Sequence, residues 1–94
     1  MKPGQKFDAD KLDWSLLPFK MIRPIIRVLM FGAKKYAPDD WQKVENARVR
    51  YLNAATRHMD DYQSGEQKDK DSGEHHLAHT VCCLLFIIWF DDKF

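Results

Sequence analysis

From Glu74 to Phe90 the chain reads EHHLAHTVCCLLFIIWF, and the architecture can be worked out from this stretch. After His79 nearly every residue is apolar, so a helix here has no polar face. Such a helix lies at the centre of a domain or at a subunit interface. Its apolar part, Leu77 to Phe90, has fourteen residues, whereas a membrane span needs about twenty. We therefore expect a buried helix and no contact with a membrane.

A second helix is predicted before it, over about Val44 to Tyr62, where apolar residues recur at helical spacing and Ser64-Gly65 marks the end. Asp71-Ser72-Gly73-Glu74 resembles a capping box and marks the expected start of the last helix. The charged segment 66–72 between the two helices is short. The two helices are therefore expected to be antiparallel neighbours.

The first helix is predicted from apolar residues that recur on one helical face, and it ends near Tyr36. These residues are Ile22, Ile25, Ile26, Leu29 and Met30. Pro18 and Pro24 bracket its start, so the helix is expected to begin near Pro24 or to be kinked there. Residues 1–13 are expected to form an arm, and 14–18 an extended lead-in that packs its apolar residues.

Length and composition predict an all-α fold in a single domain over residues 1–94. The chain is 45% hydrophobic and 31% charged, which is typical of globular proteins. The predicted architecture is a small bundle of three to four helices. Because so short a chain builds only a small core, we expect oligomerisation to complete it, which makes a homo-oligomer the predicted assembly.

The charge pattern argues against a nucleic-acid polymer as the ligand and allows a small anion. The net charge is +1 and lysines alternate with acids, so the basic face that a nucleic-acid polymer needs is missing. A compact anion such as a nucleoside triphosphate needs only a few cations.

The two cysteines point to the cellular compartment. Cys82 and Cys83 are adjacent, which is poor geometry for a disulfide on a helix. They are interpreted as reduced core residues, with a metal or redox pair as the alternative. The polar N-terminus shows no signal peptide, so a cytoplasmic protein is expected.

Three of the four histidines lie at the start of the last helix, at 75, 76 and 79. His76 and His79 are three residues apart, and so are His58 and Asp61 on the preceding helix. Two antiparallel helices could bring these four residues together, as facing ligand pairs do in helix bundles. The alternative is that these histidines are merely hydrogen-bonded polar residues, and His75 is expected to be exposed.

Carboxylates are frequent around these histidines. They are Asp60, Glu66, Asp69, Asp71 and Glu74. Oxygen ligands suit Mg²⁺ or Mn²⁺ and imidazoles favour Zn²⁺, iron or copper, so residue types alone leave the metal open.

A second group of residues suits a nucleotide. Lys34 and Lys35 could hold phosphates, or could simply be favourable cations at a helix C-terminus. Trp41 could stack on a base or cap the core. Arg57 could clamp a phosphate or pair with a loop acid.

Several segments, in order, resemble the phage-type dATP/dGTP diphosphohydrolases, which are MazG-like all-α nucleotide pyrophosphohydrolases. The similar segments are Lys11 to Pro18, Phe31-Gly32-Ala33-Lys34-Lys35-Tyr36 with Trp41, Ala54-Ala55-Thr56-Arg57-His58, Gly65-Glu66 with Asp69, Asp71-Ser72-Gly73 and His76-Leu77-Ala78-His79. The resemblance covers about Lys11 to Phe90.

The resemblance implies metal-dependent hydrolysis of a purine deoxynucleoside triphosphate to the monophosphate and pyrophosphate, in the host cytoplasm if the chain is phage-encoded. It implies a metal site formed or supported by His58, Glu66, Asp69, Asp71, His76 and His79. Catalysis would involve His58, Asp61, His76 and His79. Phosphates would be held by Lys34, Lys35 and Arg57, and the nucleoside would be bordered by Tyr36 and Trp41.

One departure from the wider superfamily affects the metal. Its classical members bind Mg²⁺ with paired Glu-x-x-Glu and Glu-x-x-Asp motifs, where this chain has His58-x-x-Asp61 and His76-x-x-His79. Fewer carboxylates favour Mn²⁺ or another transition metal. Two other functions stay open: a protein that sequesters a nucleotide without cleaving it, and a structural protein with Zn²⁺ on His76 and His79 at a subunit interface.

Overall fold

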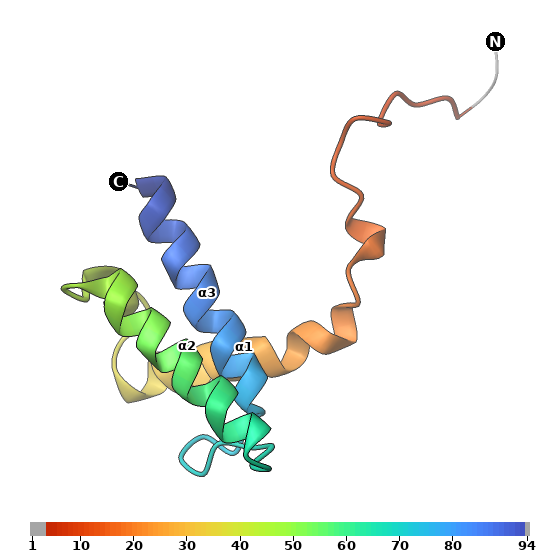
Figure 1. Ribbon diagram of the computed structural model, residues 1–94. Coiled ribbons are helices and arrows are strands. Elements are labelled where there is room, and N and C mark those ends of the chain that lie inside the picture. The colour runs from red at the N-terminus through yellow and green to blue at the C-terminus, as the bar shows by residue number, and fades with distance from the viewer. Residues whose placement is uncertain (1–3, 94) are drawn as a thin grey trace.

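The computed structural model describes residues 4–93, and over this range the fold is all-α with no strand. Figure 1 shows three helices: α1 (Phe19–Lys35), α2 (Ala47–Gln63) and α3 (His76–Lys93). Two short 3₁₀ helices, η1 (Trp14–Leu16) and η2 (Asp40–Lys43), precede α1 and α2. The predicted all-α fold class is confirmed.

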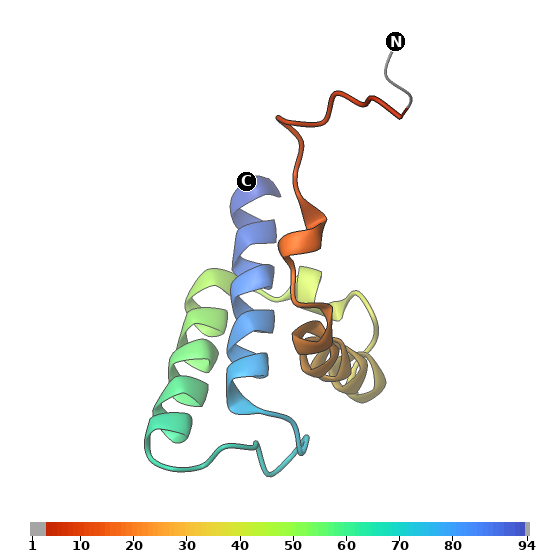
Figure 2. The same cartoon turned by 90° about the vertical axis from the view of Figure 1, so that its right-hand side faces the viewer.

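Helices α2 and α3 form an antiparallel pair, and α1 runs across α3 (Figure 2). One core cluster lies where α1 meets α3 and consists of Val28, Ala78 and Cys82, with Ile25 and Phe86 packed against it. Small side chains at 78 and 82, one turn apart on α3, form one face on which α1 can pack. The pairing of α2 with α3 agrees with the antiparallel arrangement expected from the short connection.

Helix α1 starts earlier than expected. It begins at Phe19 and runs through Pro24, so the expectation of a start near Pro24 is wrong. The amide of Met21 donates to the Pro18 carbonyl at 2.8 Å, which begins the helical hydrogen bonding before Pro24. Pro24 removes one backbone donor, yet the helix continues because Ile25 and Val28 pack in the core.

Helix α3 starts later than expected, at His76, and the predicted capping box at 71–74 does not form. Ser72 accepts a hydrogen bond from the Glu74 amide, and Asp69 accepts from the amide of Ser72, so these polar groups stabilise the turn. The His75 ring instead accepts from the Leu77 amide at 3.0 Å at the start of α3. A polar side chain here can either cap the helix or stabilise the turn before it, and the spacing of residues does not tell which occurs.

Residues 4–18 extend away from the helices (Figure 1), and residues 1–3 of the expected arm lie outside the described residues. The expectation that the lead-in packs its apolar residues is wrong within one chain, because Trp14 is 65% and Leu16 80% exposed. Likewise, Leu84, Leu85 and Ile88 of α3 are exposed, so the last helix is not buried on every side. No helix among residues 4–93 has the length and apolar content to span a membrane.

The two cysteines of α3 are free and buried, as the sequence predicted. Burial raises the pKa of Cys82 to about 12 and that of Cys83 to about 11. Both are therefore thiols at neutral pH, which argues against the alternative of a metal or redox pair.

Candidate functional site

Three histidines from α2 and α3 lie against one another near the end of the helix pair. The Nδ1 atoms of His58 and His76 are 2.8 Å apart, and the ring of His58 stacks on that of His79 with centroids 4.4 Å apart. The pairing follows from register, because the Thr80 hydroxyl donates to the Ala55 carbonyl and sets α2 against α3 one turn away. The helices thus bring together the facing pairs expected from the sequence.

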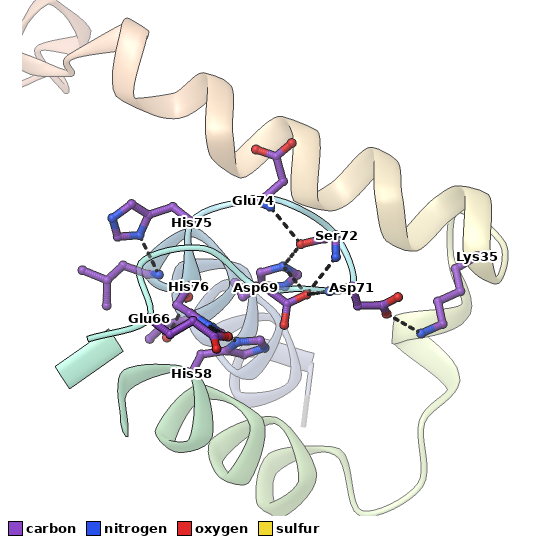
Figure 3. A network of polar contacts seen from close by, with 12 residues as sticks. Lys35, His58, Glu66, Asp69, Asp71, Ser72, Glu74, His75 and His76 are labelled. Carbon is purple, nitrogen blue, oxygen red and sulfur yellow. Dashed lines mark hydrogen bonds and ion pairs between the residues drawn. The ribbon is translucent and has the colours of Figure 1, made fainter. Parts of the chain in front are cut away.

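The loop between α2 and α3 supplies carboxylates to this cluster (Figure 3). Glu66 Oε1 lies 2.8 Å from His76 Nε2, and Asp69 Oδ2 lies 3.9 Å from His79 Nε2. Ser72 Oγ lies 2.6 Å from the same His79 nitrogen. The loop folds inward because the Asp69 carboxylate accepts hydrogen bonds from the amides of Asp71 and Ser72.

His76 is fully buried, and both of its ring nitrogens have partners. Glu66 is an acceptor, so Nε2 of His76 carries the proton and donates to it. In a neutral His76, Nδ1 then has a lone pair and accepts from Nδ1–H of His58. A carboxylate that fixes the tautomer of a histidine in this way is the usual support of a metal-ligating imidazole.

Burial keeps the imidazoles of His58 and His79 neutral. Burial lowers the pKa of His58 to about 4, and the neighbouring His79 acts in the same direction. Burial also lowers the pKa of His79, although Asp69 opposes it. Neutral imidazoles are the form that binds metal ions.

The Asp69 carboxylate of this cluster stays ionised. Partial burial would raise the pKa of Asp69, but hydrogen bonds from Ser72 and the nearby His79 lower it overall.

Two sets of side chains have ligand atoms that all lie within 4.8 Å of one another. The sets are His58, Asp69 and His76, and Asp61, Glu66 and His76. A set with two imidazoles and one carboxylate suits Mn²⁺ or Zn²⁺ better than Mg²⁺, which prefers oxygen ligands. The donors therefore fit a divalent transition metal, once the hydrogen bond between His58 and His76 gives way to it.

A groove of about 1090 Å³ begins at this cluster and is open to solvent. Its polar end is lined by His58, Asp61, Asp69, Asp71 and His79. Val28, Cys82, Cys83 and Phe86 form its apolar part. This volume is slightly above the range of about 300–1000 Å³ that is usual for small-molecule sites.

Four of the five residues predicted to bind substrate line this groove. They are Lys35, Tyr36, Trp41 and Arg57. Lys35 Nζ lies 3.1 Å from Asp71 Oδ2, which holds the pKa of Lys35 above its usual value. Lys34 is exposed and is not among the lining residues.

Trp41 has a structural as well as a lining position. Its ring stacks on Phe86 with centroids 4.4 Å apart and meets Trp89 edge-on. The alternative of a tryptophan that caps the core is therefore the one that its contacts favour, while one side of it borders the groove.

Sequence reasoning did not single out Arg50 and Asn53, which also line the groove. They precede Arg57 on α2 by seven and four residues, which places all three on one helical face. That spacing was the available signal. Ser72 was considered only as part of a motif. In the structure its hydroxyl contacts His79 Nε2 and accepts from the Glu74 amide in the turn before α3.

Comparisons with known proteins agree with the resemblance. A profile of the family described as dATP/dGTP diphosphohydrolase, N-terminal, matches residues 1–94. A protein of Salmonella phage PMBT28 named dATP/dGTP diphosphohydrolase is 35% identical over 86 residues. The match covers 92% of this chain and 29% of that protein, so the chain spans less than a third of its relative's length. No solved structure matches the chain.

Proposed function

The chain belongs to the dATP/dGTP diphosphohydrolase N-terminal domain family, and we propose that it hydrolyses a purine deoxynucleoside triphosphate to the monophosphate and pyrophosphate. The observation that carries the proposal is the groove itself. It joins a cluster of candidate metal ligands to cationic and aromatic side chains along one continuous surface. A nucleotide needs these three kinds of contact for its metal ion, its phosphates and its base.

The residues divide the work along the groove. Lys35 of α1 and Arg57 of α2 provide positive charge for the phosphates. Tyr36 and one side of Trp41 offer aromatic surface for the base. In hydrolysis, water attacks a phosphoryl group and the bond to the pyrophosphate oxygen breaks, so the protein mainly positions groups and neutralises charge.

His58, Asp69 and His76 would hold the metal ion, with Glu66 orienting His76 from behind. When bound there, a divalent ion supplies charge neutralisation and activates water as the nucleophile. His79 lies beside this set, between Ser72 and Asp69, where a neutral imidazole can accept a proton from the attacking water. Asp61 belongs to the second donor set, and Asp71 lies further along the groove beside Lys35.

The test is to incubate the purified chain with each dNTP and NTP, with Mg²⁺ or Mn²⁺, and to separate the products by chromatography. Monophosphate and pyrophosphate from dATP or dGTP are expected, with a higher rate in Mn²⁺. His79→Gln should remove turnover while circular dichroism keeps its helical signal. If wild-type protein returns every nucleotide intact under all conditions, the proposed hydrolysis is wrong.

A second candidate is a protein that sequesters a nucleotide without cleaving it. It is favoured by one observation: both ring nitrogens of the fully buried His76 already have partners, His58 and Glu66, at 2.8 Å. If His76 keeps both contacts when a nucleotide is bound, the groove holds that nucleotide without a metal ion. Stoichiometric, metal-independent retention of an intact nucleotide would identify this function. A structural Zn²⁺ site between subunits is disfavoured, because a fully buried His76 cannot reach a second chain.

A further inference from the structure

Two polar side chains of the groove have no part in the proposed chemistry. Arg50 and Asn53 line the groove from α2, on the same helical face as Arg57. Each residue of a helix rises by about 1.5 Å, so Asn53 lies about 7.5 Å and Arg50 about 12 Å along the axis from His58, a candidate metal ligand. A nucleotide that has its phosphates beside His58 and Arg57 and extends along α2 would bring its base to these two side chains.

The aromatic end of the groove lies beside the same part of α2. The Tyr51 hydroxyl donates to the Trp41 carbonyl at 3.1 Å, which holds η2 against the first two turns of α2. These turns also carry Arg50 and Asn53. Proteins that recognise a single nucleotide stack an aromatic ring on the face of the base and place hydrogen-bonding groups at its edge. This end of the groove contains both kinds of group.

Both polar side chains have hydrogen-bonding groups that a ligand can use. Among residues 4–93, the Asn53 amide has no hydrogen-bond partner. Arg50 makes one long hydrogen bond, from Nη1 to the Glu45 carbonyl at 3.4 Å, which leaves most of its five N–H donors for a ligand. Both residues are exposed, so a ligand in the groove can reach them without breaking a buried contact.

We propose that Asn53 and Arg50 recognise the edge of a purine base, an inference that rests on the proposed nucleotide substrate. Adenine presents a donor at N6 and an acceptor at N7, which match the acceptor and donor of an asparagine amide. Guanine presents acceptors at O6 and N7, which match the paired donors of an arginine. The two side chains thus give the groove one partner for each purine. A pyrimidine has no N7 and cannot form either contact.

The first experiment is calorimetric binding of dAMP and dGMP in the presence of Mn²⁺. A monophosphate carries the base but lacks the bond that the proposed hydrolysis breaks. Asn53→Ala should weaken dAMP binding about tenfold and dGMP binding less than about twofold, and Arg50→Ala should do the reverse, because each loses the partner of one base. Equal losses for the two monophosphates would overturn the proposal, since a phosphate ligand or a structural residue does not distinguish the bases.

Matched controls remove the same chemical groups outside the groove. Gln63→Ala removes an exposed amide at the end of α2, and Arg23→Ala removes an exposed guanidinium from α1. Neither residue lines the groove. Both variants should bind dAMP and dGMP as the wild type does. A shift of base preference in a control as large as that in its partner variant would also overturn the proposal.

The second experiment changes the ligand atom instead of the protein. 7-Deaza-dAMP and 7-deaza-dGMP have carbon in place of N7, and the wild type should bind each about tenfold more weakly than the natural monophosphate. In Asn53→Ala the difference between dAMP and 7-deaza-dAMP should disappear, while the difference for guanine remains; Arg50→Ala should show the converse. Such coupling between one side chain and one ligand atom identifies a direct contact. Differences that are the same in the wild type and both variants would show that other groups bind N7.

Base recognition and hydrolysis can fail separately. If every triphosphate is returned intact but the two variants shift the base preference as expected, the proposed hydrolysis is wrong and base recognition stands. If the chain hydrolyses nucleotides and both variants keep the wild-type preference between dATP and dGTP, base recognition by Asn53 and Arg50 is wrong. A wild type that binds neither monophosphate would also overturn it.

Discussion

Lys34 and Lys35 are neighbours in sequence and differ in what they reach. Both come from the last turn of α1, where cations are favourable. Only Lys35 lines the groove, where it pairs with Asp71 and lies 5.6 Å from the centre of the Tyr36 ring. At the scale of single residues, the direction of one side chain separates a candidate phosphate ligand from a solvated cation.

This difference gives a paired prediction. Lys35→Ala should raise the KM for the nucleotide about tenfold, because it removes a positive charge from the groove. Lys34→Ala should leave the KM within about twofold, since an exposed charge outside the groove is screened by solvent. Steady-state kinetics on both variants checks this. Equal effects of the two substitutions would return Lys35 to the role of a simple helix-end cation.

Asp69 combines two functions in one side chain. It belongs to one of the sets that could hold a metal ion, and it also accepts the amide hydrogen bonds that fold the loop over the site. Asp69→Asn should reduce Mn²⁺ affinity by about tenfold to a hundredfold, because a ligand charge is lost. Asp60→Asn, an equal change at an exposed site one residue before the donor Asp61, is the control. Calorimetric titration with Mn²⁺ that shows no difference between the two would exclude Asp69 as a ligand.

At the scale of elements, the loop between α2 and α3 determines the site. It carries Glu66, Asp69 and Ser72, and its turns require glycine at two places, Gly65 and Gly73, which have positive φ angles of 106° and 75°. Helices α2 and α3 provide the frame, and this loop provides the carboxylates. The expected start of α3 at 71–74 was wrong because the same residues build the turn.

The backbone of this loop can be tested through glycine. Gly73→Ala should lower the free energy of unfolding by about 1–2 kcal/mol, because a side chain is strained at positive φ. Gly32→Ala should raise it by about 0.5–1 kcal/mol, since position 32 is within α1 and an added Cβ meets nothing within 4 Å. Urea unfolding of both variants is the measurement. A neutral Gly73→Ala would mean that the loop relaxes without cost.

For the whole molecule, the histidines of the cluster make the folding stability depend on pH. The pKa of His58 is about 4 in the folded chain and about 6.5 when unfolded. Between these values the unfolded chain binds the proton more readily, so stability is full above pH 6.5 and falls as the pH drops towards 4. His79, whose pKa is also lowered, adds to the same trend.

We therefore expect metal-free protein to lose about 1–2 kcal/mol of unfolding free energy between pH 7 and pH 5 through His58, a range that allows for screening of its partly exposed ring. His58→Gln should flatten this dependence, whereas His75→Gln, which removes a histidine outside the groove, should not. Chemical denaturation in a chelating buffer at both pH values tests the difference. A pH dependence that is unchanged in His58→Gln would show that other groups cause it.

The helical fold class and the antiparallel pairing of the last two helices could be predicted from the residues alone. Apolar periodicity is a local property, so it predicts a helix wherever it occurs, and a short connection forces neighbours. The same reasoning placed His58, Asp61, His76 and His79 in one region, because residues three apart on facing helices point to a common space. The family resemblance also came from local motifs, and the family comparison confirmed it.

The three-dimensional arrangement was needed to tell which polar groups lie in the site and which stabilise backbone turns. Asp69, Ser72 and His75 each accept a backbone hydrogen bond within residues 69–77, and Ser72 also contacts His79, which spacing alone does not predict. The structure also shows that Lys35 lines the groove whereas Lys34 does not, and that Trp41 stacks on Phe86. Local pattern sets the type of an element, whereas side-chain direction and burial are set by what packs against it.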